Sequence, residues 1–107
     1  MTKKIIQFDK LSLIRKNFKS KKIVLCHGVF DVLHFGHIKH LQAAKEIGDI
    51  LIVSITSDKF VNKGPGRPFF KLEKRLETIS ALGCVDYVVN SNFPDALPIN
   101  DKIEDFI

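Results

Sequence analysis

The fold of this chain is decided by one stretch, Ile23-Val-Leu-Cys-His-Gly-Val-Phe-Asp-Val-Leu-His-Phe-Gly-His-Ile-Lys-His-Leu-Gln-Ala-Ala-Lys-Glu-Ile-Gly48. It begins with an apolar run of strand length, passes through a glycine-marked turn that holds two histidines, and continues with helical periodicity. In open α/β folds such a strand, turn and helix form a phosphate site, because free backbone N–H groups and the positive end of a helix dipole meet at the carboxyl edge of the sheet. We therefore expect the active site here.

The composition of the chain is that of one globular domain. Its 107 residues are 45% hydrophobic and 27% charged, and a chain of this length buries only about 60 to 70% of its unfolded surface. No apolar run approaches the roughly 20 residues that span a bilayer, and the first residues lack the pattern of a secretory signal. We expect a single cytoplasmic domain over residues 1–107, with no membrane partner.

The formal net charge of +5 favours an acidic partner, either a nucleic acid, an anionic lipid or a phosphorylated small molecule. Much of the excess lies before the first predicted strand, at Arg15, Lys16, Lys19, Lys21 and Lys22. A solvated helix end explains this cluster, and a field that attracts polyanionic substrates is the alternative. Because the chain lacks the aromatic interleaving and the motifs of nucleic-acid readers, we expect no nucleic-acid partner.

The rest of the chain alternates between helical and strand-like patterns. The apolar spacing predicts strands over residues 23–26, 49–55 and 85–89, and helices over 9–18, 36–48 and 71–82. The apolar side of a fourth helix is formed by Ile99, Ile103, Phe106 and Ile107. Strands that alternate with helices build parallel βαβ units. The prediction is an α/β fold, a Rossmann-like doubly wound parallel sheet, with residues 1–21 as an N-terminal helical extension within the domain.

A sheet of three strands would be small and open along one edge. The predicted domain therefore looks truncated after its third strand, as if its C-terminal part were missing. We expect either that the chain is an excised portion of a longer protein or that another chain supplies the missing edge, as in a homodimer.

His34 and His37 are three residues apart at the turn, so their side chains can project to the same side of a helix start. Gly36 between them allows the backbone to approach a ligand closely. As a metal pair they are too few, because no third His, Cys or carboxylate has a convincing spacing. We interpret them as donors to phosphate oxygens, with a capping or solvent-facing role as the alternative. His27 is expected to line the floor of the site, and His40 to be structural or exposed.

The turn also carries a specific signature. The segment Gly28-Val-Phe-Asp-Val-Leu-His-Phe-Gly-His37 resembles the G-x-F-D-x-x-H-x-G-H motif of the nucleotidyltransferase superfamily, in its cytidylyltransferase-like branch. Three later segments look most like heptose-phosphate adenylyltransferase domains, and glycerol-3-phosphate cytidylyltransferases are also similar; they are Lys63-Gly-Pro-Gly-Arg-Pro68, Glu73-Lys-Arg75 and Val85-Asp-Tyr-Val-Val89. The resemblance covers about residues 22–89.

The resemblance implies a reaction and its partners. A nucleoside monophosphate would pass from CTP or ATP to a phosphorylated sugar or polyol, with Mg²⁺ bound along with the nucleoside triphosphate and with release of pyrophosphate. Such a transfer depends mainly on positioning and on charge stabilisation. The implied catalytic residues are His34 and His37, as donors to the α-phosphate and leaving oxygens, and Lys63, which would bring a cation to the phosphates.

The resemblance also implies a nucleotide pocket at the turn. Its residues would be Gly28, Val29, Phe30, Asp31 and Gly36. The backbone around Val29 and Phe30 would line the pocket, and Asp31 would either fix the turn or approach the substrate.

Three basic residues after the second predicted strand have competing interpretations. Lys63 is either a phosphate ligand or a solvated loop residue, and Arg67 and Arg75 are candidates for substrate binding. Arg75 is alternatively a helix-surface residue or the ion-pair partner of Glu73 or Asp86.

One part of the family pattern is absent from this sequence. Related enzymes place an Ile- or Cys-Ser-Thr-Thr type segment at a later helix start, where it contacts the nucleotide phosphates, and nothing similar follows Val89. The alternative function is therefore a catalytically inactive nucleotide-binding or interaction module, a fragment of such an enzyme.

Overall fold

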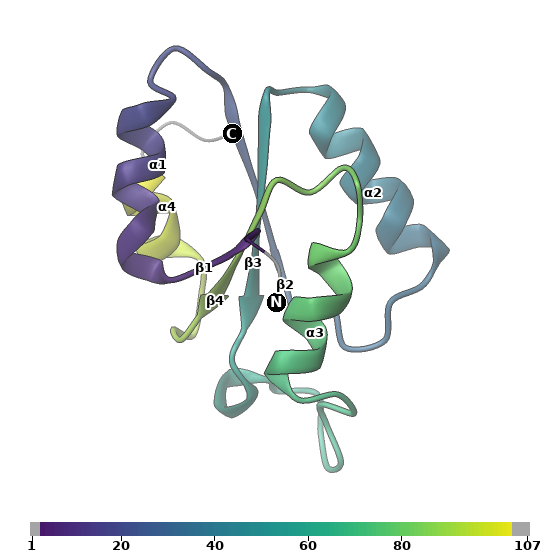
Figure 1. The fold of residues 1–107 in the computed structure, drawn as a ribbon. Helices are drawn as coiled ribbons and strands as arrows, with labels where there is room; N and C mark the ends of the chain where they lie inside the picture. The colour runs from purple at the N-terminus through teal and green to yellow at the C-terminus, as the bar shows by residue number, and fades with distance from the viewer. Residues whose placement is uncertain (1–2, 104–107) are drawn as a thin grey trace.

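Four parallel strands form one sheet in the order β1-β4-β3-β2 in the computed structural model, which describes residues 3–103 (Figure 1). The strands are β1 (Ile5–Ile6), β2 (Ile23–Gly28), β3 (Ile50–Thr56) and β4 (Tyr87–Ser91). The helices are α1 (Leu11–Asn17), α2 (Phe35–Glu46), α3 (Leu72–Ser80) and α4 (Leu97–Ile103), with short 3-10 helices η1 (Phe8–Lys10) and η2 (Asp58–Phe60). The predicted α/β fold with a parallel sheet is confirmed.

The prediction of three strands was wrong by one. Strand β1 pairs in parallel with β4, with Ile5 opposite Val88 and Ile6 opposite Val89. Because a strand of two residues covers only one period of the strand alternation, no repeating apolar pattern in the sequence marks it. Residues 1–21 are therefore not a purely helical extension, since their described part begins with an edge strand of the sheet.

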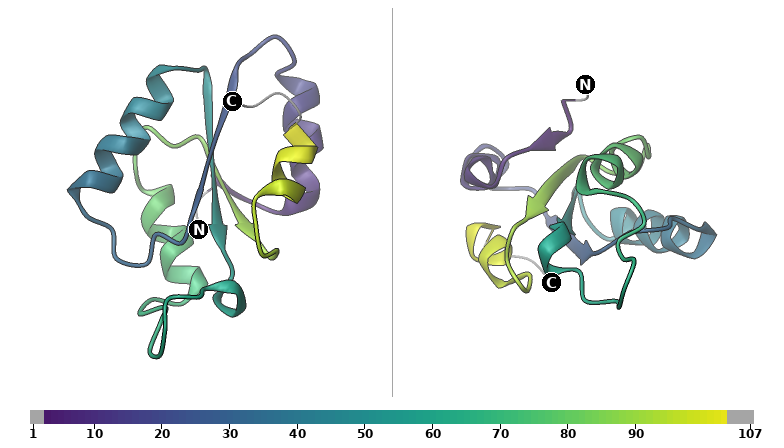
Figure 2. Two further views of the ribbon diagram at one scale, coloured as in Figure 1. Left: turned by 180° about the vertical axis from the view of Figure 1, so that it is seen from behind. Right: turned by 90° about the horizontal axis from the view of Figure 1, so that it is seen from below.

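Helices cover both faces of the sheet, as a doubly wound fold requires (Figure 2). Helices α2 and α3 contribute Leu41, Ala44 and Ile79 to one core, and α1 and α4 contribute residues to the other. All seven residues of β3 are buried between these two layers, which explains why its sequence is almost continuously apolar.

The predicted fourth helix is present as α4. Ile99 and Ile103 are fully buried in the core beside α1, while Phe106 and Ile107 lie outside the described residues. No helix in the described part of the chain has the length and apolar character needed to cross a bilayer.

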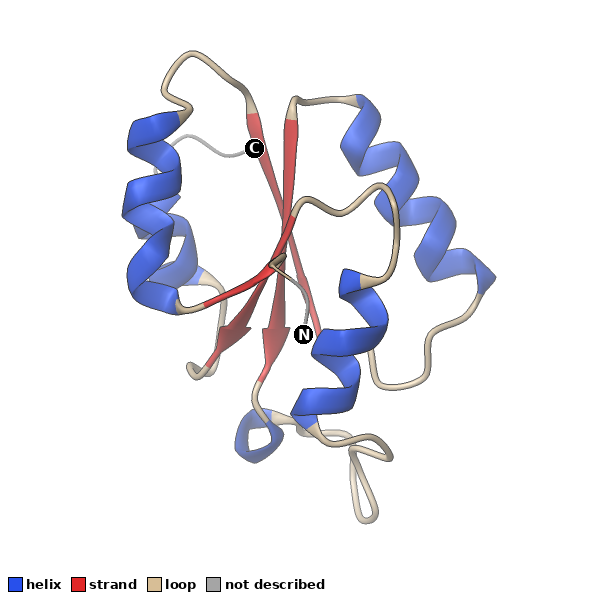
Figure 3. Ribbon diagram, in the orientation of Figure 1, coloured by secondary structure: helices blue, strands red, loops and turns tan. Residues whose placement is uncertain are grey.

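The register of the sheet places the ends of its strands at one edge. Gly28 pairs with Ile55, and Thr56 with Ser91, so β2, β3 and β4 finish side by side (Figure 3). The turn from β2 to α2 and the loop from β3 to α3 both leave from this carboxyl edge, which is where ligands bind in open α/β sheets.

Candidate active site

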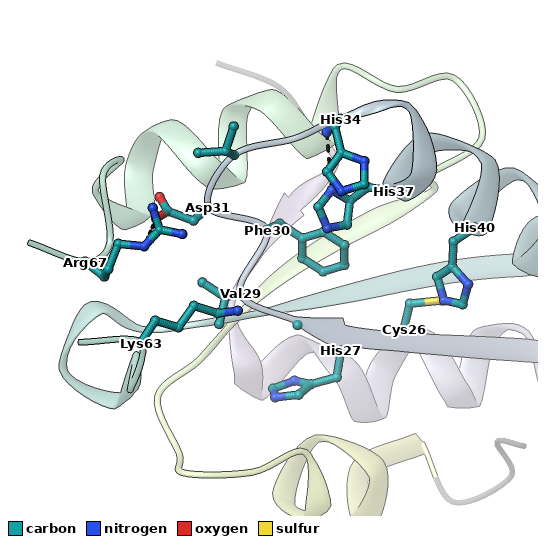
Figure 4. A pocket seen from close by; sticks show the side chains of 12 residues that line it. Cys26, His27, Val29, Phe30, Asp31, His34, His37, His40, Lys63 and Arg67 are labelled. Atoms are coloured by element: carbon teal, nitrogen blue, oxygen red, sulfur yellow. Dashed lines mark hydrogen bonds and ion pairs between the residues drawn. The ribbon is translucent and has the colours of Figure 1, made fainter. Parts of the chain in front are cut away.

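A cavity of about 560 Å³ lies at the carboxyl edge, beside the end of β2 (Figure 4). Eight of the ten predicted site residues line it; only Gly36 and Arg75 do not. Two segments supply most of its walls. We name residues 28–37 the histidine turn and residues 61–71 the lysine loop. Lys63 and Arg67 of the lysine loop lie across the cavity from His34 and His37 (Figure 4).

The two histidines form a reciprocal cap at the start of α2. The Nδ1 atom of His34, the N-cap residue, accepts the N–H of Gly36 at 3.0 Å, and the Nδ1 atom of His37 accepts the N–H of His34 at 3.3 Å. An Nδ1 atom that accepts a hydrogen bond carries no proton, so each neutral ring carries its proton on Nε2. The Nε2–H groups are therefore the donors that each ring can offer to a ligand.

The two imidazole rings lie against each other, with centroids 4.0 Å apart. The pKa of His37 is lowered, first by partial burial and then by electrostatic interactions with the neighbouring side chains of His34, His40 and Lys63. His37 is therefore neutral at neutral pH, in the form that keeps its Nδ1 atom as an acceptor.

Phe30 holds His37 from the side of the turn. Its backbone has φ of 52°, in the left-handed region that a bulky residue rarely adopts, and its ring meets the His37 ring edge to face at 5.7 Å. A Cβ atom at Gly28 would lie 3.0 Å from this phenyl ring. Gly28 therefore leaves room for the Phe30 ring, a packing role distinct from the direct nucleotide contact implied by the resemblance.

Gly36 faces His34 in a similar way. A Cβ atom at Gly36 would lie 2.8 Å from Cε1 of the His34 ring, closer than such carbon atoms approach each other in proteins. The glycine in the H-x-G-H pattern therefore lets the capping imidazole fold over the first turn of α2.

Asp31 links the histidine turn to the lysine loop. Its buried carboxylate accepts the N–H of Phe69 at 2.8 Å on Oδ2 and that of Phe70 at 2.9 Å on Oδ1, and Arg67 Nε lies 3.5 Å from Oδ2. Burial raises the pKa of Asp31, but the two N–H donors and the charges of Arg67 and Arg75 outweigh it and lower the pKa. Both carboxylate oxygens are thus engaged by the lysine loop.

Arg75 is buried, and its guanidinium group joins four segments: the lysine loop, the histidine turn, the end of β3 and η2. Its Nε donates to the carbonyl of Phe70, its Nη1 to the carbonyls of Val29 and Thr56, and its Nη2 to Asp58 Oδ1 at 2.6 Å. Because its side chain is 0% exposed, the structure gives Arg75 a structural position in place of the predicted substrate contact.

Both alternatives suggested for Arg75 were also wrong. It is not on the helix surface, and its ion-pair partner is Asp58, not Glu73 or Asp86. Asp86 instead accepts Lys45 Nζ and the N–H of Leu51. The error arose because a charged residue among other charged residues on a helix suggests a solvated face, whereas the lysine loop covers this position.

The remaining two histidines also line the cavity. His27 was expected there, and its Nδ1 lies 2.6 Å from Ser54 Oγ on β3; its pKa is lowered by burial, against the opposing effect of Asp95. His40 was not expected in the site, and its Nε2 lies 4.0 Å from Cys26 Sγ. Because His40 is three residues after His37 on the same helix, this spacing could have predicted that both side chains face the cavity.

A protein-held metal ion does not fit this cavity. Within residues 3–103, no group of three or more His, Cys, Asp or Glu side chains is arranged to hold one. The carboxylate that does line the cavity, Asp31, already accepts two backbone N–H groups and faces Arg67. The cavity is instead rich in imidazole, ammonium and guanidinium groups, which suit phosphate oxygens.

Residues 25–104 match the family model described as cytidylyltransferase-like. The chain is 46% identical over 86 residues to the bifunctional protein HldE of Sulfurimonas denitrificans, covering 77% of the chain and 18% of that protein. It is 43% identical over 100 residues to HldE of Campylobacter fetus, covering 92% of the chain and 21% of that protein. The chain thus spans about a fifth of the length of the curated relatives it matches.

Two solved structures share the fold. A lipopolysaccharide core biosynthesis protein from Thermoplasma volcanium superposes with a TM-score of 0.72 at 32% identity, over 78% of this chain and 69% of that one. A pantoate-beta-alanine ligase from Francisella tularensis, complexed with beta-gamma ATP and beta-alanine, gives a TM-score of 0.60 at 26% identity, over 80% of this chain and 34% of that one.

The doubly wound sheet and its matches define a domain of the nucleotidyltransferase class. Since the family model covers most of the sequence, the chain belongs to the cytidylyltransferase-like family. The resemblance inferred from the histidine turn is confirmed.

Proposed function

We propose that this domain transfers a nucleoside monophosphate from ATP or CTP to a sugar phosphate, with release of pyrophosphate. The observation that carries the proposal is the reciprocal cap of His34 and His37, which directs two Nε2–H donors away from the helix they cap. They lie at the N-terminus of α2, in a cavity that also holds Lys63 and Arg67. This is the donor set that a polyphosphate requires.

In the proposed reaction, an oxygen of the acceptor phosphate attacks the α-phosphorus of the nucleoside triphosphate. The bond from the α-phosphorus to the oxygen that bridges it to the β-phosphorus breaks, and its electron pair leaves on pyrophosphate. His34 and His37 donate hydrogen bonds to the α-phosphate oxygens, whose charge grows as the new bond forms. Lys63 stabilises the charge of the departing pyrophosphate.

We further propose that Mg²⁺ is held by the triphosphate and not by this domain. The cationic lining of the cavity and the engagement of Asp31 by the lysine loop support this. Bound Mg²⁺ would neutralise part of the phosphate charge, while the residues of this chain bind and orient the phosphates. We expect the reaction to take place in the cytoplasm.

A phosphorylated sugar is the acceptor that the relatives favour over a polyol phosphate. One solved relative is a lipopolysaccharide core biosynthesis protein, and the sequence of the lysine loop resembles heptose-phosphate adenylyltransferase domains. The related ligase is complexed with beta-gamma ATP, which supports ATP as one of the two candidate nucleotides here.

Pyrophosphate release from the intact protein tests this function. ATP and CTP are each supplied with Mg²⁺ and with either a heptose phosphate or glycerol 3-phosphate. We expect turnover with one nucleotide and one acceptor, and a fall in kcat of about 10²-fold or more in His37→Ala, as for the loss of one transition-state donor. Gln42→Ala, at an exposed position of the same helix, is the matched control and should retain the rate. An unchanged rate in His37→Ala would contradict the assigned role.

A catalytically inactive nucleotide-binding module is the second candidate. It is favoured by one observation, the cationic lining of the cavity, which suits a bound nucleotide whether or not a transfer follows. Calorimetry with ATP and CTP, together with the pyrophosphate assay, distinguishes the two. Nucleotide binding without pyrophosphate release in the presence of any acceptor supports the module, and turnover refutes it.

A further inference from the structure

The two walls of the cavity come from segments far apart in the sequence, and their relative position decides whether the site works. His34 and His37 belong to the histidine turn, whereas Lys63 belongs to the lysine loop, which is exposed over residues 62–66. A misplacement of about 1 Å between reacting groups can cost as much as 10²-fold in rate. Something must therefore hold the lysine loop against the histidine turn.

Two buried charged side chains join the histidine turn to the lysine loop, one as a hydrogen-bond acceptor and the other as a hydrogen-bond donor. Asp31, from the histidine turn, accepts the N–H groups of Phe69 and Phe70 in the lysine loop. Arg75, from α3, donates to the carbonyl of Phe70 and also to that of Val29 in the histidine turn. Both backbone groups of Phe70 are thus held, one by each side chain.

Arg75 also anchors this arrangement to the sheet. Its Nη1 donates to the carbonyl of Thr56, the last residue of β3, and its Nη2 pairs with Asp58 in η2. Because a buried charge that loses its partners is costly, the loop cannot leave Asp31 and Arg75 without a large loss of free energy. The contacts therefore hold both ends of the segment that carries Lys63, at Asp58 before the lysine loop and at Phe69 and Phe70 within it.

We propose that Asp31 and Arg75 are positioning residues, which set the place of Lys63 relative to the histidine pair without touching the substrate. The proposal rests on the proposed function for its kinetic consequence. It departs from the direct nucleotide or substrate contacts that the family resemblance implied for these two residues. It also explains why two charged side chains near a phosphate site make their hydrogen bonds to the protein.

The test is a double-mutant cycle with Lys63→Ala in the intact protein. Asp31→Asn leaves one acceptor for two N–H donors, and Arg75→Lys replaces a fork of donors by a single ammonium group. We expect each to lower kcat/KM for pyrophosphate release by about 10-fold or more in the wild-type background. In the Lys63→Ala background each should cost no more than about 2-fold, because the group being positioned is gone. Equal losses in both backgrounds would overturn the proposal.

Asp86→Asn is the matched control, because Asp86 also accepts a backbone N–H and a cation, at the opposite edge of the sheet. It should lower the melting temperature as Asp31→Asn does but leave kcat unchanged. Amide hydrogen exchange gives a readout that needs no turnover. The amides of Phe69 and Phe70 should lose protection in Asp31→Asn and keep it in Asp86→Asn; retained protection in Asp31→Asn would overturn the proposal.

The proposed function and this inference can fail separately. If the wild-type protein binds ATP but releases no pyrophosphate, the proposed function is refuted, and the same cycle is measured on the dissociation constant of ATP. If the substitutions of Asp31 and Arg75 weaken ATP binding less in the Lys63→Ala background than in the wild-type background, the positioning role is supported. If their effects on the dissociation constant are the same in both backgrounds, it is refuted. A wild-type protein that does not bind ATP or CTP refutes both.

Discussion

His34 has two tasks that a substitution can separate. Its Nδ1 atom caps α2 by accepting the N–H of Gly36, and its ring lines the cavity. A side chain that keeps the first task and loses the second would show which of them limits activity.

We expect His34→Ala to lower the free energy of unfolding by about 1 kcal/mol through loss of the N-cap, and to lower kcat as well. His34→Asn should recover the stability, because Asn is among the best N-caps, but not kcat. Urea denaturation and pyrophosphate release measure the two effects. Recovery of activity in His34→Asn would show that His34 is only a cap.

The lowered pKa values of His37 and His27 predict how stability depends on pH. Both have burial as the largest cause, so both bind protons more weakly in the folded than in the unfolded protein. The unfolded value is about 6.5. Stability from these groups is therefore fully present above about pH 6.5 and is lost as the pH falls through the folded pKa values.

Urea denaturation between pH 8 and pH 5 checks this dependence. The free energy of unfolding should decline with falling pH below about 6.5, and the decline should be shallower in His37→Gln, which has one fewer group to protonate. A decline of the same steepness in the variant would mean that His37 does not contribute.

The strand, turn and helix around the two histidines were predictable because their signals are local. The apolar run at β2, the glycine-marked turn and the helical spacing after it reproduce β2 and α2 to within two residues at either end. The contacts of Arg75 were not predictable, because they depend on where a distant loop packs. The packing roles of Gly28 and Gly36 were hidden for a similar reason, since each depends on a ring that folds back over the turn.

The start of α2 should tolerate no side chain at Gly36. We expect Gly36→Ala to displace the His34 ring and lower kcat by about 10-fold or more, although alanine is the better helix former. Gly83, after α3, has open space around its added Cβ atom, so Gly83→Ala is the control that should leave kcat unchanged. Steady-state kinetics of the two variants measure the difference; equal rates would contradict the role given to Gly36.

Because the two cores lie on opposite faces of the sheet, a substitution in the core beside α1 should change stability without changing the active site. Ile99 of α4 is fully buried in the core beside α1, on the face opposite α2. Ile99→Ala should lower the free energy of unfolding by about 2 to 5 kcal/mol and leave kcat of the folded protein unchanged. Denaturation and kinetics at a temperature where the variant is folded check this; a matching fall in kcat would show that the two faces are coupled.

The strand order of the sheet also bears on whether two copies of the chain associate. Within residues 3–103, β2 is an outer strand that pairs only with β3, and an outer strand presents unpaired backbone groups to another chain. A homodimer stays a prediction of this arrangement. Sedimentation equilibrium of the intact protein should give the mass of two chains, and a single-chain mass at all concentrations would refute it.

The contacts of Asp31 and Arg75 with the lysine loop end at Phe69 and Phe70, which leaves its tip outside them. At this tip, Gly64 and Gly66 have positive φ angles and no atom within 4 Å of an added Cβ. Extra residues inserted beside Pro65 would therefore extend into solvent and leave the base of the loop in place. A longer loop could therefore be engineered at this tip while the contacts of Asp31 and Arg75 at its base stay in place.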